Sequence, residues 1–273
     1  MAVGEPPTPT GGYDPEHYGS LALIEDRHFW FRARNQAIRA FAAQICVACT
    51  PGYRVLEVGC GTGNVLRNLE VVCQGGIVIG MDLYAQGFQF AKQRSRCPLV
   101  QADAAQPPFA CQFHLIGMFD VIEHISDDAA LLKDAHRLLA PGGALLVTVP
   151  AHMSLWSYFD EASGHCRRYA REELQRRLTG AGFEVEYLSE YMCSVAPLVW
   201  LWRLIVGNRR GAGRSADIVK RELQVYPLVN ALLSLLMSQE VRWLSARRHL
   251  PLGTSLIAIA RRREPDESVG GPY

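Results

Sequence analysis

The sequence predicts an α/β fold: a doubly wound, Rossmann-like, mostly parallel sheet with helices on both faces. Three observations support this prediction. Between residues 54 and 150, short apolar runs alternate with segments of helical periodicity. The runs are almost continuously apolar, as are strands that are covered on both faces. A glycine-rich stretch directly follows the first run, which is typical of a strand–turn–helix unit that binds a ligand.

The predicted strands follow from this alternation. We expect strands at 54–59, 77–83, 99–103, 113–122 and 144–150, then near 183–188 and 254–260. Helices are expected at 64–72, 84–95 and 171–180. A better marked helix begins at Ser126, a suitable N-cap, and is stopped by Pro141-Gly142-Gly143. The predicted order β-α-β-α-β implies a parallel sheet.

The 273 residues divide into six predicted parts. They are a disordered leader at 1–13, a helical cap at 14–50, an α/β core at 51–191 with a polar-aromatic loop at 151–170, an apolar helical insertion at 192–250, a last core strand within 251–263, and a tail at 264–273. The amino terminus has neither a basic nor an apolar region of the kind found in signal peptides, so we expect a cytoplasmic protein.

The composition excludes some function classes. A net charge of +1 is not that of a nucleic-acid-binding surface, so no nucleic acid partner is expected. Eight scattered cysteines fit a reducing compartment, and the lone pair Cys46 and Cys49 is interpreted as two small buried side chains.

The apolar runs at 192–207 and 225–237 are shorter than the ~20 residues that cross a bilayer. Two interpretations remain: walls of an apolar pocket or dimer face, or a surface in peripheral contact with a membrane through Arg209, Arg210 and Arg214. Monomer and homodimer both stay open.

The glycine stretch runs from Glu57 to Gly63 and reads EVGCGTG. Glycines there let the backbone approach a ligand closely. Glu57 puts a carboxylate before the turn, where it would repel a pyrophosphate but attract an ammonium or sulfonium group. Asp82 ends the second strand, 19 residues after Gly63, where it can accept hydrogen bonds from both ribose hydroxyls. The alternative interpretation is a plain tight turn beside a surface acid.

The segments VLEVGCGTGN, VIGMDL, QADA, FDVIEHI and LLAPGG, in this order over residues 50–150, resemble the class I S-adenosylmethionine-dependent methyltransferases. The flanking HFWFRARN and LWSYFDEASGHCRRY resemble a bacterial branch associated with sugar, lipid or natural-product pathways. The resemblance implies that S-adenosylmethionine is the cofactor. It assigns the methionine end to Glu57, the loop to Gly59, Cys60, Gly61 and Gly63, the ribose to Asp82, and the adenine and pocket floor to Leu83, Asp103, Ala104 and Phe119.

Methyl transfer then needs an acceptor, alignment and a base from outside the glycine loop. The expected acceptor is a small, amphiphilic molecule such as a natural product, prenyl compound or lipid-linked sugar, methylated on oxygen, nitrogen or carbon. Candidate catalytic residues are Asp120, His124, His152, His165 and Tyr169, and candidate substrate-binding residues are Trp30, Trp156, Arg167 and Arg168. The loop at 151–170 is interpreted as an acceptor lid.

Asp120, Glu123 and His124 are spaced i, i+3, i+4. A similar acid-x-x-Glu-His pattern binds a divalent ion in ubiquinone-pathway O-methyltransferases, although similar stretches occur in relatives that need no metal. No metal ligand is therefore assigned, and a metal-assisted O-methyltransferase is the alternative. A nicotinamide-dependent oxidoreductase and a non-catalytic adenosyl-ligand binder are the two other hypotheses.

Overall fold

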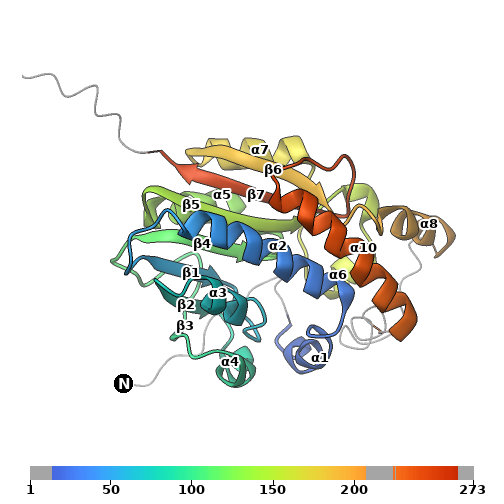
Figure 1. Ribbon diagram of the computed structural model, residues 1–273, viewed down its shortest axis with the longest axis horizontal. Helices are drawn as coiled ribbons and strands as arrows, with labels where there is room; N and C mark the ends of the chain where they lie inside the picture. The colour runs from blue at the N-terminus through green and yellow to red at the C-terminus, as the bar shows by residue number, and fades with distance from the viewer. Residues whose placement is uncertain (1–13, 207–223, 225, 264–273) are drawn as a thin grey trace, which may run out of the picture.

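The computed structural model describes residues 14–206, 224 and 226–263. The predicted leader, the predicted tail and Arg209, Arg210 and Arg214 lie outside these residues. The described chain forms one sheet in the order β3-β2-β1-β4-β5-β7-β6 (Figure 1). Its strands are β1 Arg54–Val58, β2 Ile77–Asp82, β3 Leu99–Gln101, β4 Phe113–Phe119, β5 Leu139–Pro150, β6 Phe183–Tyr191 and β7 Ser255–Arg262. Strands β1 to β5 pair in parallel, and β7 pairs antiparallel with both β5 and β6, which confirms the predicted mostly parallel sheet.

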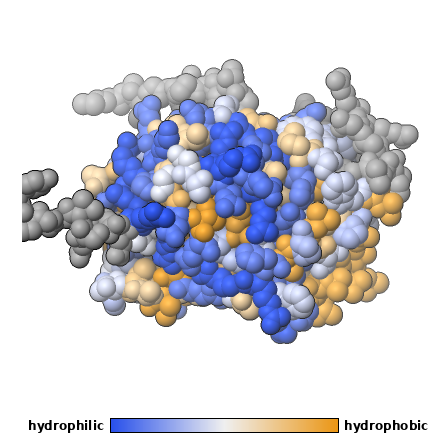
Figure 2. Space-filling model, turned by 90° about the horizontal axis from the view of Figure 1, so that it is seen from above, coloured by the Kyte–Doolittle hydropathy of each residue, from blue (hydrophilic) through white to orange (hydrophobic). Residues whose placement is uncertain are grey.

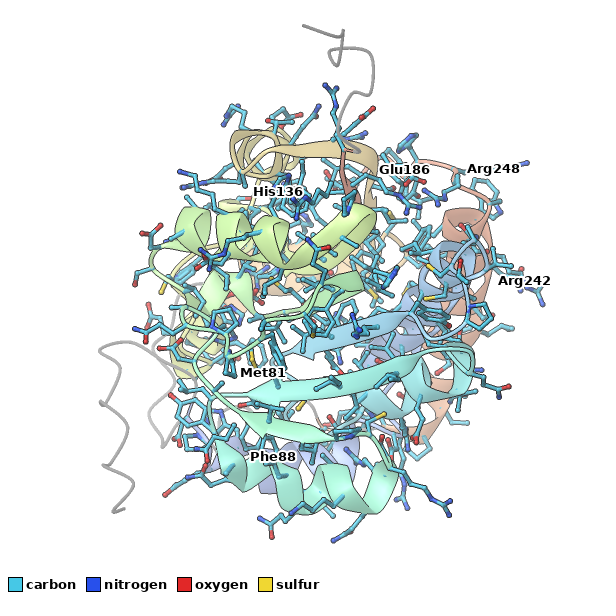
Figure 3. The ribbon with its side chains drawn as sticks, turned by 90° about the vertical axis from the view of Figure 1, so that its left-hand side faces the viewer. Met81, Phe88, His136, Glu186, Arg242 and Arg248 are labelled. Atoms are coloured by element: carbon cyan, nitrogen blue, oxygen red, sulfur yellow. The ribbon has the colours of Figure 1, made fainter. Side chains whose placement is uncertain are left out.

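Helices cover both faces of the sheet. One face carries α2, α3 and α10 and the other carries α5 and α7, so His136 on α5 and Arg242 on α10 lie on opposite sides in Figure 3. Each face has its own apolar cluster against the sheet. The helices are α1 His17–Ile24, α2 Phe29–Cys46, α3 Leu66–Val72, α4 Phe88–Arg94, α5 Asp128–Leu138, α6 Tyr158–Ala162, α7 Arg171–Gly180, α8 Ala196–Val206 and α10 Pro227–Ser245, with short 3₁₀ turns η1 Ala85–Gly87, η2 Ile122–His124 and η3 Met153–Leu155.

The predicted helical segment at the amino terminus is present as α1 and α2. The ring of His28 caps α2 by accepting a hydrogen bond from the backbone N–H of Trp30 at 3.2 Å. Asn230 on α10 accepts from the N–H of Phe29 at 2.8 Å and donates to the carbonyl of Arg27 at 2.9 Å. The carboxyl-terminal helix α10 therefore holds the junction between α1 and α2.

Two local predictions were wrong in detail. The N-cap of α5 is Asp127 and not Ser126, because the Asp127 carboxylate accepts from the N–H of Ala130, three residues on. The helix also ends at Leu138, before Pro141-Gly142-Gly143, because β5 already starts at Leu139 and pairs there with Phe113. Within the loop predicted to be irregular, Ser157 and Asp160 form a capping box that starts α6.

The apolar insertion is only partly buried. Helix α10 packs on α2 through Leu233, Met237 and Leu244, whereas Leu228 is 87% exposed and Leu232, Leu235 and Trp243 are also exposed. In the part of the chain that the structure describes, no helix has both the length and the apolar character that a bilayer crossing requires.

Candidate active site

A cavity of about 250 Å³ lies at the carboxyl ends of β1, β2 and β4. This is where ligands bind in open α/β sheets, because the loops after neighbouring parallel strands meet there. The cap helices α1 and α2 form its other side. Its lining includes nine of the ten residues predicted to contact a cofactor: Glu57, Gly59, Cys60, Gly61, Asp82, Leu83, Asp103, Ala104 and Phe119.

The glycine loop is fixed by its main chain. Gly59, Gly61 and Gly63 have φ values of 74°, 48° and 74°, a backbone region that residues with a Cβ rarely adopt. A Cβ on Gly59 would lie 2.5 Å from Cγ2 of Val121. Gly63, the tenth predicted residue, does not line the cavity, since it packs against Ala91 of α4. Because Gly63 has no side chain, α4 can pack closely against it, and the neighbouring residues of the loop line the cavity instead.

Asp82 lies at the end of β2, is buried, and already accepts three hydrogen bonds. The backbone N–H groups of Gly61 and Tyr84 donate at 2.7 and 2.9 Å, and the Tyr18 hydroxyl donates at 3.1 Å. Burial raises the pKa of Asp82, although these bonds oppose the rise. A carboxylate has about four acceptor positions, so a further donor can still be accommodated.

Glu57 and Arg34 place opposite charges at one end of the cavity. Glu57 at the end of β1 is 2% exposed, and its Oε2 has no hydrogen-bond partner among the described residues. Burial raises the pKa of Glu57 well above its usual value, and the nearby Arg34 opposes this only in part. Arg34 of α2 forms an ion pair with Asp120 at 2.6 Å. The unpartnered Glu57 oxygen is therefore suited to a cationic donor on a ligand.

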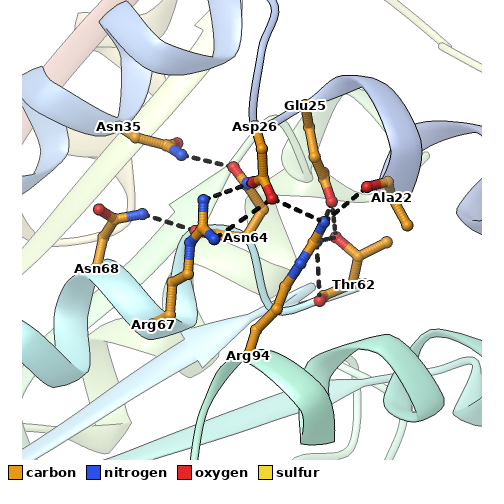
Figure 4. Close-up of polar contacts among 9 residues, drawn as sticks. All are labelled: Ala22, Glu25, Asp26, Asn35, Thr62, Asn64, Arg67, Asn68 and Arg94. Atoms are coloured by element: carbon orange, nitrogen blue, oxygen red, sulfur yellow. Dashed lines mark hydrogen bonds and ion pairs between the residues drawn. The ribbon is translucent and has the colours of Figure 1, made fainter.

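Charged side chains hold the cap on the glycine loop (Figure 4). Glu25, which follows α1, accepts from the Thr62 hydroxyl at 2.5 Å and is paired with Arg94 of α4. The next residue, Asp26, is paired with Arg67 of α3 at 2.5 Å. These contacts join the cap to both helices that flank the loop, so the cavity is closed on that side by ion pairs.

Two of the five predicted catalytic residues, Asp120 and His124, line the cavity. His165 is brought beside His124, with ring centroids 4.8 Å apart, because the N–H of Cys166 donates to the carbonyl of Glu123 at 2.8 Å. Burial and the neighbouring His165 lower the pKa of His124 to about 3, so this imidazole is neutral at physiological pH.

The remaining predicted catalytic residues do not line the cavity in the described structure. The His152 ring is bonded to Glu190 at 3.0 Å, and the Tyr169 hydroxyl donates to the buried Asp128 at 2.8 Å. Both contacts are of a kind that also fixes loops in position, so the predicted catalytic roles of these two residues have no support from their placement.

The predicted substrate-binding residues also lie outside the cavity lining. Arg167 is paired with Asp128 at 2.9 Å, and Arg168 with the fully buried Asp160 at 2.7 Å. The indole of Trp30 lies 5.0 Å from the Arg34 guanidinium, and Trp156 is half-buried next to η3. Contact of any of them with an acceptor stays a prediction.

Sequence reasoning missed the cap residues that line the cavity, chiefly Tyr18, Glu25 and Arg34. For Arg34 a signal was available. It shares the buried stripe of α2 with Phe31, Ile38 and Phe41, at helical spacing, and a charged residue on such a stripe requires a partner.

Comparison with known proteins decides the family. A family model described as a methyltransferase domain matches residues 25–188, which is more than half of the chain. The matched range includes β1 to β5 and all residues that line the cavity except Tyr18 and Leu21 of α1. The chain belongs to the methyltransferase-domain family.

Individual relatives agree with the family. The chain is 32% identical over 169 residues to a protein of Mycolicibacterium smegmatis named a probable S-adenosylmethionine-dependent methyltransferase, a match that covers 60% of this chain and 62% of that protein. It is 28% identical over 106 residues to a ubiquinone biosynthesis O-methyltransferase of Psychrobacter cryohalolentis, covering 36% and 40%. The chain thus spans about three fifths or less of the length of these curated relatives.

A solved structure supports the fold alone. A phosphoethanolamine N-methyltransferase 2 of Haemonchus contortus, in complex with S-adenosyl-L-methionine, matches with a TM-score of 0.51 at 20% identity, covering 79% of this chain and 50% of that one. This likeness agrees with the α/β fold described above.

Proposed function

We propose that this methyltransferase domain binds S-adenosylmethionine and transfers its methyl group to a small acceptor. The observation that carries the proposal is the charge of the cavity. Five carboxylates line it: Glu25 and Asp120, which are paired with Arg94 and Arg34, and Glu57, Asp82 and Asp103, which have no ion pair among the described residues. Of these acids, Glu57 has an unpartnered buried oxygen. Such a lining favours a sulfonium nucleoside with an ammonium group over a diphosphate.

The proposed cofactor position follows from the donors and acceptors. Asp82 accepts from the ribose hydroxyls, as predicted from its place at the end of β2. At the methionine end, Glu57 accepts from the ammonium group. Arg34, which the sequence prediction lacked, donates to the methionine carboxylate. Leu83, Asp103, Ala104 and Phe119 then surround the adenine and the pocket floor.

The chemistry that this site must supply is limited. Because the sulfonium already activates the methyl carbon, the protein aligns the acceptor, excludes water, and accepts a proton where the acceptor atom carries one. Asp120 and His124 are the predicted catalytic residues that line the cavity, where they can contact an acceptor.

The acceptor we propose is amphiphilic, with an apolar part that can come from a membrane. Exposed leucines on α8 and α10 form an apolar region on one side of the molecule, which is orange at the lower right of Figure 2. Next to it on α10, Trp243 lies under the guanidinium of Arg248, 5.6 Å away, and Arg242 is also exposed. Apolar, aromatic and basic side chains in sequence along one helix favour peripheral contact with an anionic bilayer.

Of two alternatives from the sequence, one fits the site less well and the other needs an assay to be distinguished. A nicotinamide cofactor would bring its diphosphate to the loop beside Glu57, and no basic residue lies in the loop itself from Glu57 to Gly63. A non-catalytic protein that binds an adenosyl ligand requires the same cavity. Detection of a methylated product distinguishes an enzyme from such a protein.

Calorimetry of the full chain tests the proposal. S-adenosylhomocysteine is expected to bind, and NAD is not. Asp82→Ala is expected to weaken S-adenosylhomocysteine binding by roughly 1–3 kcal/mol, because the hydrogen bonds that the ribose hydroxyls donate to the charged carboxylate are lost. Asp134→Asn, which changes an acid in an ion pair on α5, is the control and should leave affinity unchanged. An unchanged dissociation constant for Asp82→Ala would remove the ribose assignment, and failure of the wild type to bind would remove the function.

A further inference from the structure

A second group of ligand-type side chains lies beside the cavity. Glu123 and His124 belong to η2, directly after β4, and His165 follows α6. One ligand atom of each lies within 4.8 Å of the others, although His165 is more than forty positions along the chain. His124 also lines the cavity, so the cluster borders it.

Glu123 is the most unusual member of this group. Its side chain is 0% exposed, and neither of its carboxylate oxygens has a hydrogen-bond partner among the described residues. A buried carboxylate without donors is costly, and such groups in proteins are normally paired or bound to a metal ion. Both oxygens of this buried carboxylate are therefore available to a cation that enters the cluster.

The two imidazoles are oriented by their outer contacts. Nδ1 of His165 bonds to Asp160 at 2.9 Å, and Nδ1 of His124 lies 3.3 Å from the carbonyl of Gly164. Both partners are acceptors, so each Nδ1 carries the proton and each Nε2 carries the lone pair. Asp160 is itself fixed by Arg168 and by the N–H of Ser157. Carboxylate–histidine pairs of this kind commonly orient metal ligands.

We propose that Glu123, His124 and His165 bind one divalent transition-metal ion beside the cavity, where His124 lines it. Two imidazoles and one carboxylate suit ions such as Zn²⁺, Mn²⁺ or Fe²⁺ better than Mg²⁺. Three protein ligands leave at least one coordination position open. Asp120 is outside this set, because Arg34 already occupies its carboxylate at 2.6 Å.

An atom of the acceptor can occupy the open coordination position of the ion. Because His124 lines the cavity, a ligand that enters there can offer an oxygen donor to the ion, which favours acceptors with a hydroxyl or carboxylate group. This role toward the acceptor rests on the proposed methyl transfer, whereas binding of the ion itself does not.

Titration of the chelator-treated full chain with Co²⁺ tests the site, since Co²⁺ bound by nitrogen and oxygen ligands has visible absorption bands that report its coordination. We expect one ion per chain, with Zn²⁺ displacing it. Glu123→Gln and His165→Gln are each expected to weaken binding at least tenfold, and Asp160→Asn by about 10–100-fold through loss of ligand orientation. His114→Gln is the matched control and should bind as the wild type does, since His114 is at the amino end of β4, the end of the strand away from the cavity.

S-adenosylhomocysteine binding, measured on the same samples, separates this proposal from the proposed function and also checks that each variant is folded. Absence of saturable Co²⁺ binding by a wild-type chain that binds S-adenosylhomocysteine would overturn the metal site alone. Equal Co²⁺ affinity of the wild type and both folded ligand variants would overturn it as well.

Discussion

The two sides of the cavity are built by different means. On the strand side, the loops after β1, β2 and β4 are fixed by main-chain conformation and by close packing, as at Gly59 and Gly63. On the cap side, α2 packs on the sheet through apolar residues, but its contacts and those of α1 around the cavity are made by charged side chains, chiefly Glu25 with Arg94 and Arg34 with Asp120. The strand side therefore depends on small residues at fixed positions, and the cap side depends on charge.

This contrast has a consequence for binding. Steric constraints on a main chain do not change with pH or salt, whereas ion pairs do. We therefore expect pH and salt to affect the cap side of the cavity more than the strand side. The following three changes test the contrast, from the largest expected effect to the smallest.

The largest effect is expected on the strand side, from Gly63→Ala. The new Cβ would lie 2.8 Å from Cα of Ala91, at a φ of 74°. Backbone strain and overpacking together should lower the free energy of unfolding by roughly 2–5 kcal/mol, measured by urea denaturation. Gly52→Ala is the matched control: its φ is 91° but nothing lies within 4 Å, so only the strain of about 1–2 kcal/mol is expected. Equal losses in both variants would show that packing against α4 is unimportant.

On the cap side, Glu25→Gln and Asp26→Asn compare adjacent carboxylates. The Glu25 and Arg94 side chains are only 5% and 12% exposed, so Glu25→Gln should lower the free energy of unfolding by about 1.5–3 kcal/mol. Asp26 and Arg67 are 40% and 36% exposed, and solvent screening limits the effect of Asp26→Asn to about 0–1 kcal/mol. Faster dissociation of S-adenosylhomocysteine should accompany the first change only. If Asp26→Asn proved the more harmful, the cap would be held mainly by the contact to α3.

The smallest effect is expected from pH. Burial raises the pKa of Glu57 well above its usual value, so the ligand-free carboxyl keeps its proton to a higher pH than an exposed glutamate does, and the protonated form attracts an ammonium group less. Affinity for S-adenosylhomocysteine should therefore increase as pH rises through that pKa, by at most about 1.4 kcal/mol per pH unit. Calorimetry from mildly acidic to neutral pH measures it. Glu57→Gln should bind more weakly and lose this dependence, and a dependence that persists in Glu57→Gln would assign it to another group.

The strand side was predictable from the sequence, and the cap side largely was not. Glu57, Gly59 and Asp82 are placed by the ends of neighbouring parallel strands, so local motifs suffice to bring them together. Tyr18 meets Asp82 across 64 positions and Glu25 meets Arg94 across 69. Such contacts depend on where a helix docks, which hydrophobic periodicity does not specify.

The polar loop at 151–170 shows a second limit. Because of their residue types, its arginines were interpreted as acceptor-binding residues and its histidines as catalytic residues. In the structure, Asp160 accepts hydrogen bonds from both His165 and Arg168, and these bonds outweigh its burial and lower its pKa to about 2. Residue type alone does not distinguish a side chain that binds a ligand from one that satisfies a buried carboxylate.

The pairing of β6 with β7 has one more consequence. Tyr191 at the end of β6 lies opposite Ser255 at the start of β7. The chain between these two residues therefore leaves the sheet and returns to it at paired positions. The entropy of closing such an excursion grows only slowly with its length. The length of this segment can thus change at low entropic cost without moving the strands that hold the cofactor cavity, so long as α10 keeps its packing on α2. Tyr191 and Ser255 are then the natural junctions for inserting another segment.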